Sequence, residues 1–247
     1  MKIILEACID SVESASAAQQ GGADRVELCA NLMEGGTTPS AGTIRLARER
    51  IDMAMYVMIR PRGGDFHYSA VEFEIMKRDI EIAAEAGADG VVMGLLNTDG
   101  TVDEARTRKL IELARPMRIT FHRAFDMTRD PFEALEALIR LGVERILTSG
   151  QERTVMEGLD LIAELNEAAK GRIIIMPGCG ITERNIAKVL KATGASEVHV
   201  AAWASLESAM KFRNAHCFMG GELRPPEFSL MTTDSLRIRS FIEAMEA

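Results

Sequence analysis

Four glycine motifs, each at the end of a helical segment and each followed at once by an apolar strand, limit most strongly what this chain can fold into. They are Gly-Gly-Ala-Asp at 21–24, Gly-Ala-Asp at 87–89, Gly-Val-Glu at 142–144 and Gly-Ala-Ser at 194–196. Gly22, Gly87, Gly142 and Gly194 are 65, 55 and 52 residues apart. This spacing fits two β/α units per repeat, with each glycine ending its helix in the left-handed conformation. Four such pairs predict a (β/α)₈ TIM barrel.

The individual strands support this count of eight. Several are apolar almost throughout, as parallel strands covered by helices are. They are Ile3–Cys8, Arg25–Cys29, Met55–Ile59, Gly90–Gly94, Arg118–His122, Arg145–Thr148, Ile173–Met176 and Glu197–Val200. The alternative is an open doubly wound sheet, but no nucleotide-binding Gly-x-Gly-x-x-Gly follows the first strand.

Three local patterns predict where helices begin. Ser69 to Glu72 and Thr154 to Glu157 both fit a capping box, and Asp130 precedes a proline at a first helical position. No linker divides the chain, so residues 1–247 are expected to form a single domain. Two glycines and two prolines at 213–231 predict an extended loop after strand eight, and a last helix is expected at about 233–247.

Composition excludes two classes of partner. The net charge is −8 and no basic cluster stands apart from acidic residues, which argues against nucleic acid. No stretch approaches the roughly 20 apolar residues of a membrane span, and the N-terminal apolar run is too short for a signal peptide. A cytoplasmic protein is therefore expected. Its four scattered cysteines, without a Cys-x-x-Cys pair, are expected to be reduced thiols.

Chemically active side chains gather at the carboxyl ends of the predicted strands, where TIM barrels carry their active sites. Strand alternation turns one set of them inward: Glu6, Cys8, Glu27, Cys29, Arg60, Thr120, His122 and His199. Glu6, Glu27, His122 and Asp126 are the candidates for proton transfer. Two alternatives remain open: the glutamates could pair with Arg60 or Arg123 in a structural network, and His122 could be a satisfied core histidine.

A second set of residues suits a small anion. Guanidinium groups match carboxylate or phosphate, so Arg60 and Arg62 are candidate anion ligands, although rim ion pairs with Asp65 or Asp126 are an alternative. The glycine-rich loop 177–182 leads into a helix expected at Thr182 and could bind phosphate through its backbone. The full predicted binding set is Arg60, Arg62, Arg123, Thr148, Ser149, Gly178, Gly180 and His199.

Cys8 and Cys29 each follow a glutamate by two residues on neighbouring parallel strands. Adjacent strands lie roughly 4.8 Å apart, so the two thiols could share a soft ion. Two thiolates without further evident ligands suit Cu(I) better than tetrahedral zinc. Barrel stagger could also place them in different layers, as two small buried thiols.

These motifs resemble one known family along nearly the whole chain. EACIDSVESA (6–15), GGADRVELC (21–29), EGGTTPS (34–40), IRPRGGDF (59–66), TFHRAFDM (120–127), LTSGQ (147–151) and MKFRN (210–214) are closely similar to the CutC family. The resemblance implies a cytoplasmic (β/α)₈ barrel with a role in copper homeostasis, which forms dimers or higher oligomers in some members. It also implies that Cys8 and Cys29 are the copper ligands.

Two functional hypotheses follow. The first is a CutC-like copper homeostasis protein that binds Cu(I) at the barrel mouth. The second is a barrel enzyme or sensor for a small anionic metabolite, a carboxylate or a phosphate, which uses the Glu/Arg/His ring at the same mouth.

Overall fold

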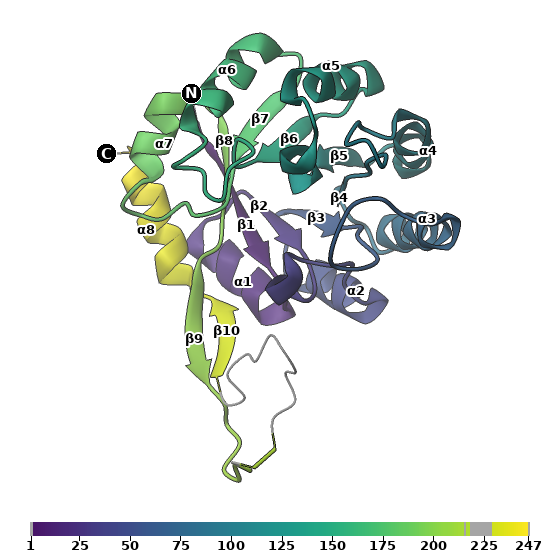
Figure 1. The fold of residues 1–247 in the computed structure, drawn as a ribbon. Coiled ribbons are helices and arrows are strands. Elements are labelled where there is room, and N and C mark those ends of the chain that lie inside the picture. Colours follow the sequence, from purple (N-terminus) through teal and green to yellow (C-terminus); the bar gives the residue numbers. More distant parts are fainter. Residues whose placement is uncertain (1, 215, 218–228, 247) are drawn as a thin grey trace.

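The computed structural model describes residues 2–214, 216–217 and 229–246, and it shows a ring of parallel strands surrounded by helices (Figure 1). The strands of the ring are β1 (Ile4–Ile9), β2 (Arg25–Leu28), β3 (Ala54–Met58), β4 (Gly90–Met93), β5 (Arg118–Phe121), β6 (Arg145–Thr148), β7 (Ile174–Pro177) and β8 (Glu197–Val200). Their order is β7-β6-β5-β4-β3-β2-β1-β8, and β7 also contacts β8. The chain is thus a nearly closed, single-domain (β/α)₈ TIM barrel, as the glycine repeat predicts.

Helices follow the strands and cover the outside of the barrel. They are α1 (Val12–Gly21), α2 (Ala41–Arg50), α3 (Ala70–Glu85), α4 (Glu104–Ala114), α5 (Pro131–Leu141), α6 (Leu159–Ala169), α7 (Ile186–Thr193) and α8 (Ser235–Glu246), with short 3-10 turns η1 (Leu32–Glu34) and η2 (Arg123–Met127). Apolar side chains from both layers form one continuous core between strands and helices. Among the described helices, none combines the length and apolarity of a transmembrane span.

The helix ends test the local predictions. Gly22, Gly87, Gly142 and Gly194 all have positive φ, between 65° and 94°, which confirms the left-handed endings. The Ser69 capping box is present, and Asp130 caps α5 ahead of its proline.

The second predicted capping box does not begin a helix. Glu157 accepts a hydrogen bond from the backbone N–H of Thr154, but these residues form a turn, and α6 begins only after Gly158. The helix expected at Thr182 also begins later, because the side chain of Asn185 accepts from the Thr182 N–H and holds a turn there.

The segment after β8 differs from the predicted loop. Trp203–Glu207 (β9) and Ser229–Thr233 (β10) pair as an antiparallel ribbon, with Leu230 opposite Leu206. Residues 229–231 therefore form a strand and not a loop, because they pair with β9, a segment that is distant in the sequence. Residues 215 and 218–228 of the predicted loop lie outside the described residues. The last helix begins at Ser235, two residues later than expected.

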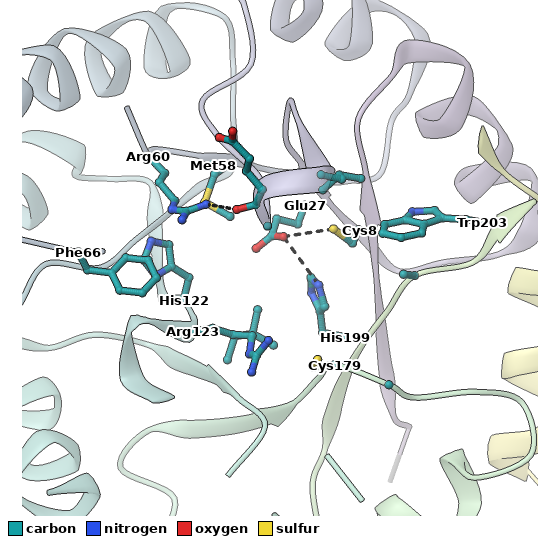
Figure 2. A pocket seen from close by; sticks show the side chains of 16 residues that line it. Cys8, Glu27, Met58, Arg60, Phe66, His122, Arg123, Cys179, His199 and Trp203 are labelled. Carbon is teal, nitrogen blue, oxygen red and sulfur yellow. Dashed lines mark hydrogen bonds and ion pairs between the residues drawn. The ribbon is translucent and has the colours of Figure 1, made fainter. Parts of the chain in front are cut away.

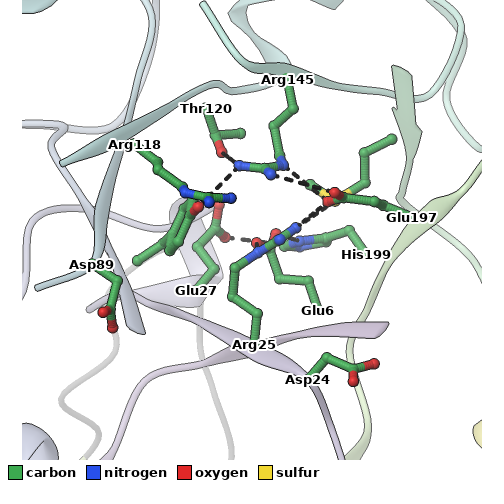
Figure 3. A network of polar contacts seen from close by, with 12 residues as sticks. Glu6, Asp24, Arg25, Glu27, Asp89, Arg118, Thr120, Arg145, Glu197 and His199 are labelled. Atoms are coloured by element: carbon green, nitrogen blue, oxygen red, sulfur yellow. Dashed lines mark hydrogen bonds and ion pairs between the residues drawn. The ribbon is translucent and has the colours of Figure 1, made fainter. Parts of the chain in front are cut away.

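The lower interior of the barrel is polar, and it forms the floor beneath the mouth (Figure 3). Arg25 donates to Glu6 and to Glu197, and the Nε atom of Arg145 lies 2.9 Å from the same Glu197 carboxylate. Both guanidinium groups lie over the ring of Tyr56. Buried charges that are paired in this way hold the first residues of β2, β6 and β8 together across the barrel.

Candidate metal and ligand site at the barrel mouth

A cavity of about 330 Å³ opens at the carboxyl ends of the strands (Figure 2). Residues from the ends of β1, β2, β3, β5, β6, β7 and β8 line it. Strand alternation directs Cys8, Glu27 and His199 inward at this level, as predicted. Met58 faces inward beside them. The charged segment that follows β3, residues 59–66, contributes Arg60 and Phe66 to the wall.

Two thiols share one carboxylate oxygen in this cavity. The Sγ atoms of Cys8 and Cys29 lie 3.6 and 3.5 Å from Oε2 of Glu27. The strand register explains this arrangement, because Cys8 of β1 is directly opposite Glu27 of β2, and Cys29 follows Glu27 by two residues. Cys8 faces the cavity, whereas Cys29 is buried behind it, 1% exposed.

His199 connects this cluster to the polar floor. Its Nδ1 lies 2.8 Å from Oε1 of Glu6, and its Nε2 lies 3.8 Å from Oε2 of Glu27. Cys8, Glu27 and His199 together offer three ligand atoms that lie within 4.8 Å of one another. Glu6 is fully buried below them and orients the imidazole without lining the cavity.

The protonation states within the cluster are unequal. Burial opposes ionisation of Glu6, but the Arg25 charge and the His199 hydrogen bond outweigh it and lower the pKa of Glu6 to about 2. The Cys29 hydrogen bond, with His199 as a further partner, lowers the pKa of Cys8 to about 5, while the pKa of Cys29 is raised well above its usual value. Burial raises the pKa of Glu27 to about 8. Cys8 is therefore the thiolate of the pair, and Cys29 keeps its proton.

The opposite wall carries Arg60, Phe66 and His122 (Figure 2). The Cζ atom of Arg60 lies 5.2 Å from the centre of the Phe66 ring, and the rings of Phe66 and His122 are 5.0 Å apart. Burial and the nearby Arg60 charge lower the pKa of His122 to about 3, so this imidazole is neutral at physiological pH. Its Nδ1 accepts from the Ala124 N–H at 3.1 Å, which places the ring proton on Nε2.

Several predicted site residues are not brought to the cavity. Arg62 donates to Glu72, to Asp65 and to main-chain carbonyls of its own loop, which is the rim ion pairing that the sequence left open. Gly178 lies beneath the lining, where a Cβ atom would come within 2.6 Å of Leu147 Cδ1.

Asp126, Thr148 and Ser149 form a structural corner instead. The Asp126 carboxylate accepts from the hydroxyl of each of the other two residues and from the Ser149 N–H. Arg123 does line the cavity, but its Nε is 2.7 Å from the same carboxylate. Asp126 thus has several donors in this corner and does not face the cavity.

The glutamate network expected as an alternative takes another form. Glu6 pairs with Arg25 and His199, not with Arg60 or Arg123, and Glu27 forms no ion pair with an arginine among the described residues. The sequence reasoning missed Met58, Phe66 and Trp203 as cavity residues. Alternation, which turns Arg60 inward, would also have placed Met58, two residues earlier, on the inner face. No local pattern indicates Trp203.

The donor set fits a soft metal ion. Two sulfur atoms and an imidazole nitrogen are ligands that Cu(I) accepts. The Oε1 atom of Glu27 is buried and lacks a hydrogen-bond partner within the described part of the chain, as expected where a bound ion or molecule completes the site. Met58 packs in the same cluster as Cys8 and Cys29 and adds a thioether nearby.

Fold and site together define the class: a TIM barrel whose mouth combines two thiols, a carboxyl group and an imidazole. A family model for the CutC family matches residues 3–204, so this chain belongs to the CutC family.

Relatives in this family are similar to the chain over nearly its whole length. The human copper homeostasis protein cutC homolog is 51% identical over 237 residues, which cover 96% of this chain and 87% of that protein. A CutC family protein of Bacteroides fragilis is 49% identical over 243 residues, 98% of this chain and 97% of the relative. The crystal structure of CutC from Streptococcus agalactiae has a TM-score of 0.76 and 35% identity, and the match covers 80% of this chain and 97% of that one. Thiamine phosphate pyrophosphorylase from Pyrococcus furiosus, 16% identical with a TM-score of 0.61 over 99% of this chain and 96% of that one, shares the fold alone.

Proposed function

We propose that this chain acts in copper homeostasis by binding Cu(I) between Cys8 and Cys29. The observation that carries the proposal is the convergence of both Sγ atoms on one oxygen of Glu27, at 3.6 and 3.5 Å. Thiols that meet at one buried atom need little movement to meet at one buried ion. The names of the human and mouse relatives, copper homeostasis protein cutC homolog, support the same function.

In this proposal the neighbouring groups assist the thiols. Cys8 offers a thiolate at neutral pH, because hydrogen bonding lowers its pKa to about 5. Cys29 releases its proton to solvent when it binds the ion, and His199 supplies a nitrogen within reach of a third coordination position. When bound, Cu(I) is the cargo of the site.

The test is an anaerobic Cu(I) competition titration against a colorimetric chelator. Wild type is expected to bind about one equivalent per chain, and the Cys8→Ser/Cys29→Ser double variant is expected to lose that binding. The matched control is Cys179→Ser/Cys217→Ser, which removes the other two thiols. Binding that the first variant retains, or that the control loses, would contradict a site at Cys8 and Cys29.

Two further proposals concern the setting of the protein. We propose that it works in the cytoplasm, where its four free thiols would stay reduced, and that it forms a homo-oligomer. Size-exclusion chromatography with light scattering tests the second point, and a monomer at micromolar concentration would contradict it.

A further inference from the structure

The cavity is much larger than a single metal ion requires. Its volume of about 330 Å³ equals roughly eleven water molecules and lies at the lower end of the range of small-molecule sites. Apolar side chains cover much of its wall: Leu32, Met58, Phe66, Leu147 and Trp203. An organic molecule of about ten non-hydrogen atoms would fit beside the thiols.

Arg60 brings a buried positive charge to this wall. It is 5% exposed, and it donates to the main-chain carbonyls of Glu34, Gly36 and Gly64 at 2.8 to 3.0 Å. No carboxylate of the described residues forms an ion pair with it, and its Nε lacks a hydrogen-bond partner there; the charge of Arg60 also acts on the buried hydroxyl of Tyr68. A buried guanidinium without an anion is costly, so this position is prepared for a negatively charged group from outside the chain.

The other charged groups of the lining do not meet this need. Arg123 is already paired with Asp126, and the side chain of Glu34 is exposed at the rim. Glu27 lies on the opposite wall with the thiols (Figure 2). Arg60 is thus the buried charge of this cavity that remains unmatched within the described ranges.

His122 adds a second free donor on the same wall. Its Nδ1 is engaged by Ala124, and its Nε2 is buried without a partner in the described structure. The centre of the Phe66 ring lies 5.0 Å from the centre of the His122 ring and 5.2 Å from the Cζ atom of Arg60. Two N–H groups and one positive charge therefore border the same aromatic side chain.

We propose that Arg60 and His122 bind the carboxylate of a small organic acid, whose apolar part packs against Phe66 and Trp203. A carboxylate matches the free groups, because it carries one negative charge and two oxygens for one cation and two donors. A phosphate dianion would leave several oxygens without donors. This site uses none of the thiols, so it stands or falls separately from copper binding.

The chain contains its own reporter. Trp203 is the single tryptophan and lines the cavity. Its fluorescence is followed while metal-free protein, kept in chelator at constant ionic strength, is titrated with acetate, phenylacetate or inorganic phosphate. A saturable change with the carboxylates is expected, with phenylacetate binding at least tenfold more tightly than acetate because its ring contacts the apolar wall.

Binding by variants tests whether Arg60 and His122 hold the carboxylate. Arg60→Lys is expected to weaken phenylacetate binding at least tenfold, because a lysine has no Nε–H at that place. His122→Asn keeps an acceptor for the Ala124 N–H, loses the Nε2 donor and is expected to weaken binding about fivefold. The matched control is Arg62→Lys on the same loop, outside the cavity, with binding within about twofold of wild type.

Circular dichroism first establishes that each variant is folded, and Arg60→Gln is measured in place of Arg60→Lys if the lysine variant unfolds. The expected dissociation constant is on the order of 1 mM. The absence of a saturable fluorescence change at ligand concentrations up to about ten times that value would overturn the proposal. So would equal binding by wild type and both Arg60 and His122 variants, or a preference for phosphate. Loss of Cu(I) binding in the cysteine variants tests the proposed function alone and leaves this result unchanged.

Discussion

Replacement of His122 by asparagine should change how the stability of this protein depends on pH. His122 is 4% exposed, and its imidazole accepts the Ala124 N–H through Nδ1. Asparagine can keep that hydrogen bond with its side-chain oxygen, but it does not titrate. The variant therefore isolates the contribution of one buried, neutral imidazole.

The sign follows from the lowered pKa. In the folded chain the pKa of His122 is about 3, below the ordinary 6.5, because of burial and the Arg60 charge. Between these values the unfolded chain binds a proton at this imidazole and the folded chain does not. The free energy of unfolding of wild type should thus fall, relative to the variant, as the pH drops from 6.5 toward 3. At about 1.4 kcal/mol per pH unit, the relative loss between pH 7 and pH 5 is about 2 kcal/mol.

Urea unfolding at pH 5, 6, 7 and 8 measures this difference. The comparison is between pH slopes, so a constant loss of packing against Phe66 does not affect it. If wild type and His122→Asn lose the same free energy between pH 7 and pH 5, His122 is not the desolvated neutral group described here.

Three other outcomes are expected. Glu197→Gln leaves two buried guanidinium groups facing a single carboxylate in the barrel floor and should lower the free energy of unfolding by about 3 kcal/mol or more in urea, whereas Glu136→Gln, which breaks an exposed pair with Arg172, should cost less than about 1 kcal/mol. His199→Asn removes a partner that lowers the pKa of Cys8, so in a mass-spectrometric time course the alkylation of that thiol by iodoacetamide should begin to slow at a higher pH than in wild type, as the pH is lowered from 8 to 5; an unchanged pH dependence would contradict the assignment. Prior loading with Cu(I) should protect Cys8 from the same reagent, and equal labelling of Cys8 with and without copper would refute its ligation of the ion.

The sequence by itself determined the architecture. Glycines such as Gly22 and Gly142 end helices because the left-handed conformation is easy for a residue without a Cβ atom, and this local property is written in the chain. Period-two alternation likewise fixed which side of each strand faces inward. The sequence alone therefore places Cys8, Glu27 and His199 inside the barrel.

Which inward groups meet depended on the tertiary structure. Strand register, not spacing along the chain, put Glu27 opposite Cys8 and within reach of both thiols. Closure of β1 against β8 brought His199 to Glu6, residues from opposite ends of the barrel sequence.

Two arginines also show that the sequence does not determine which side chains meet. Arg60 and Arg62 look alike in the sequence, yet one lines the cavity without a carboxylate partner in the described structure, and the other is held at the rim by Glu72 and Asp65. A guanidinium reaches many atoms on its long side chain, so its partner is decided by which loops fold beside it. The cavity and its Trp203 wall arise in the same way, from segments that meet only in three dimensions, and no local propensity encodes such a meeting.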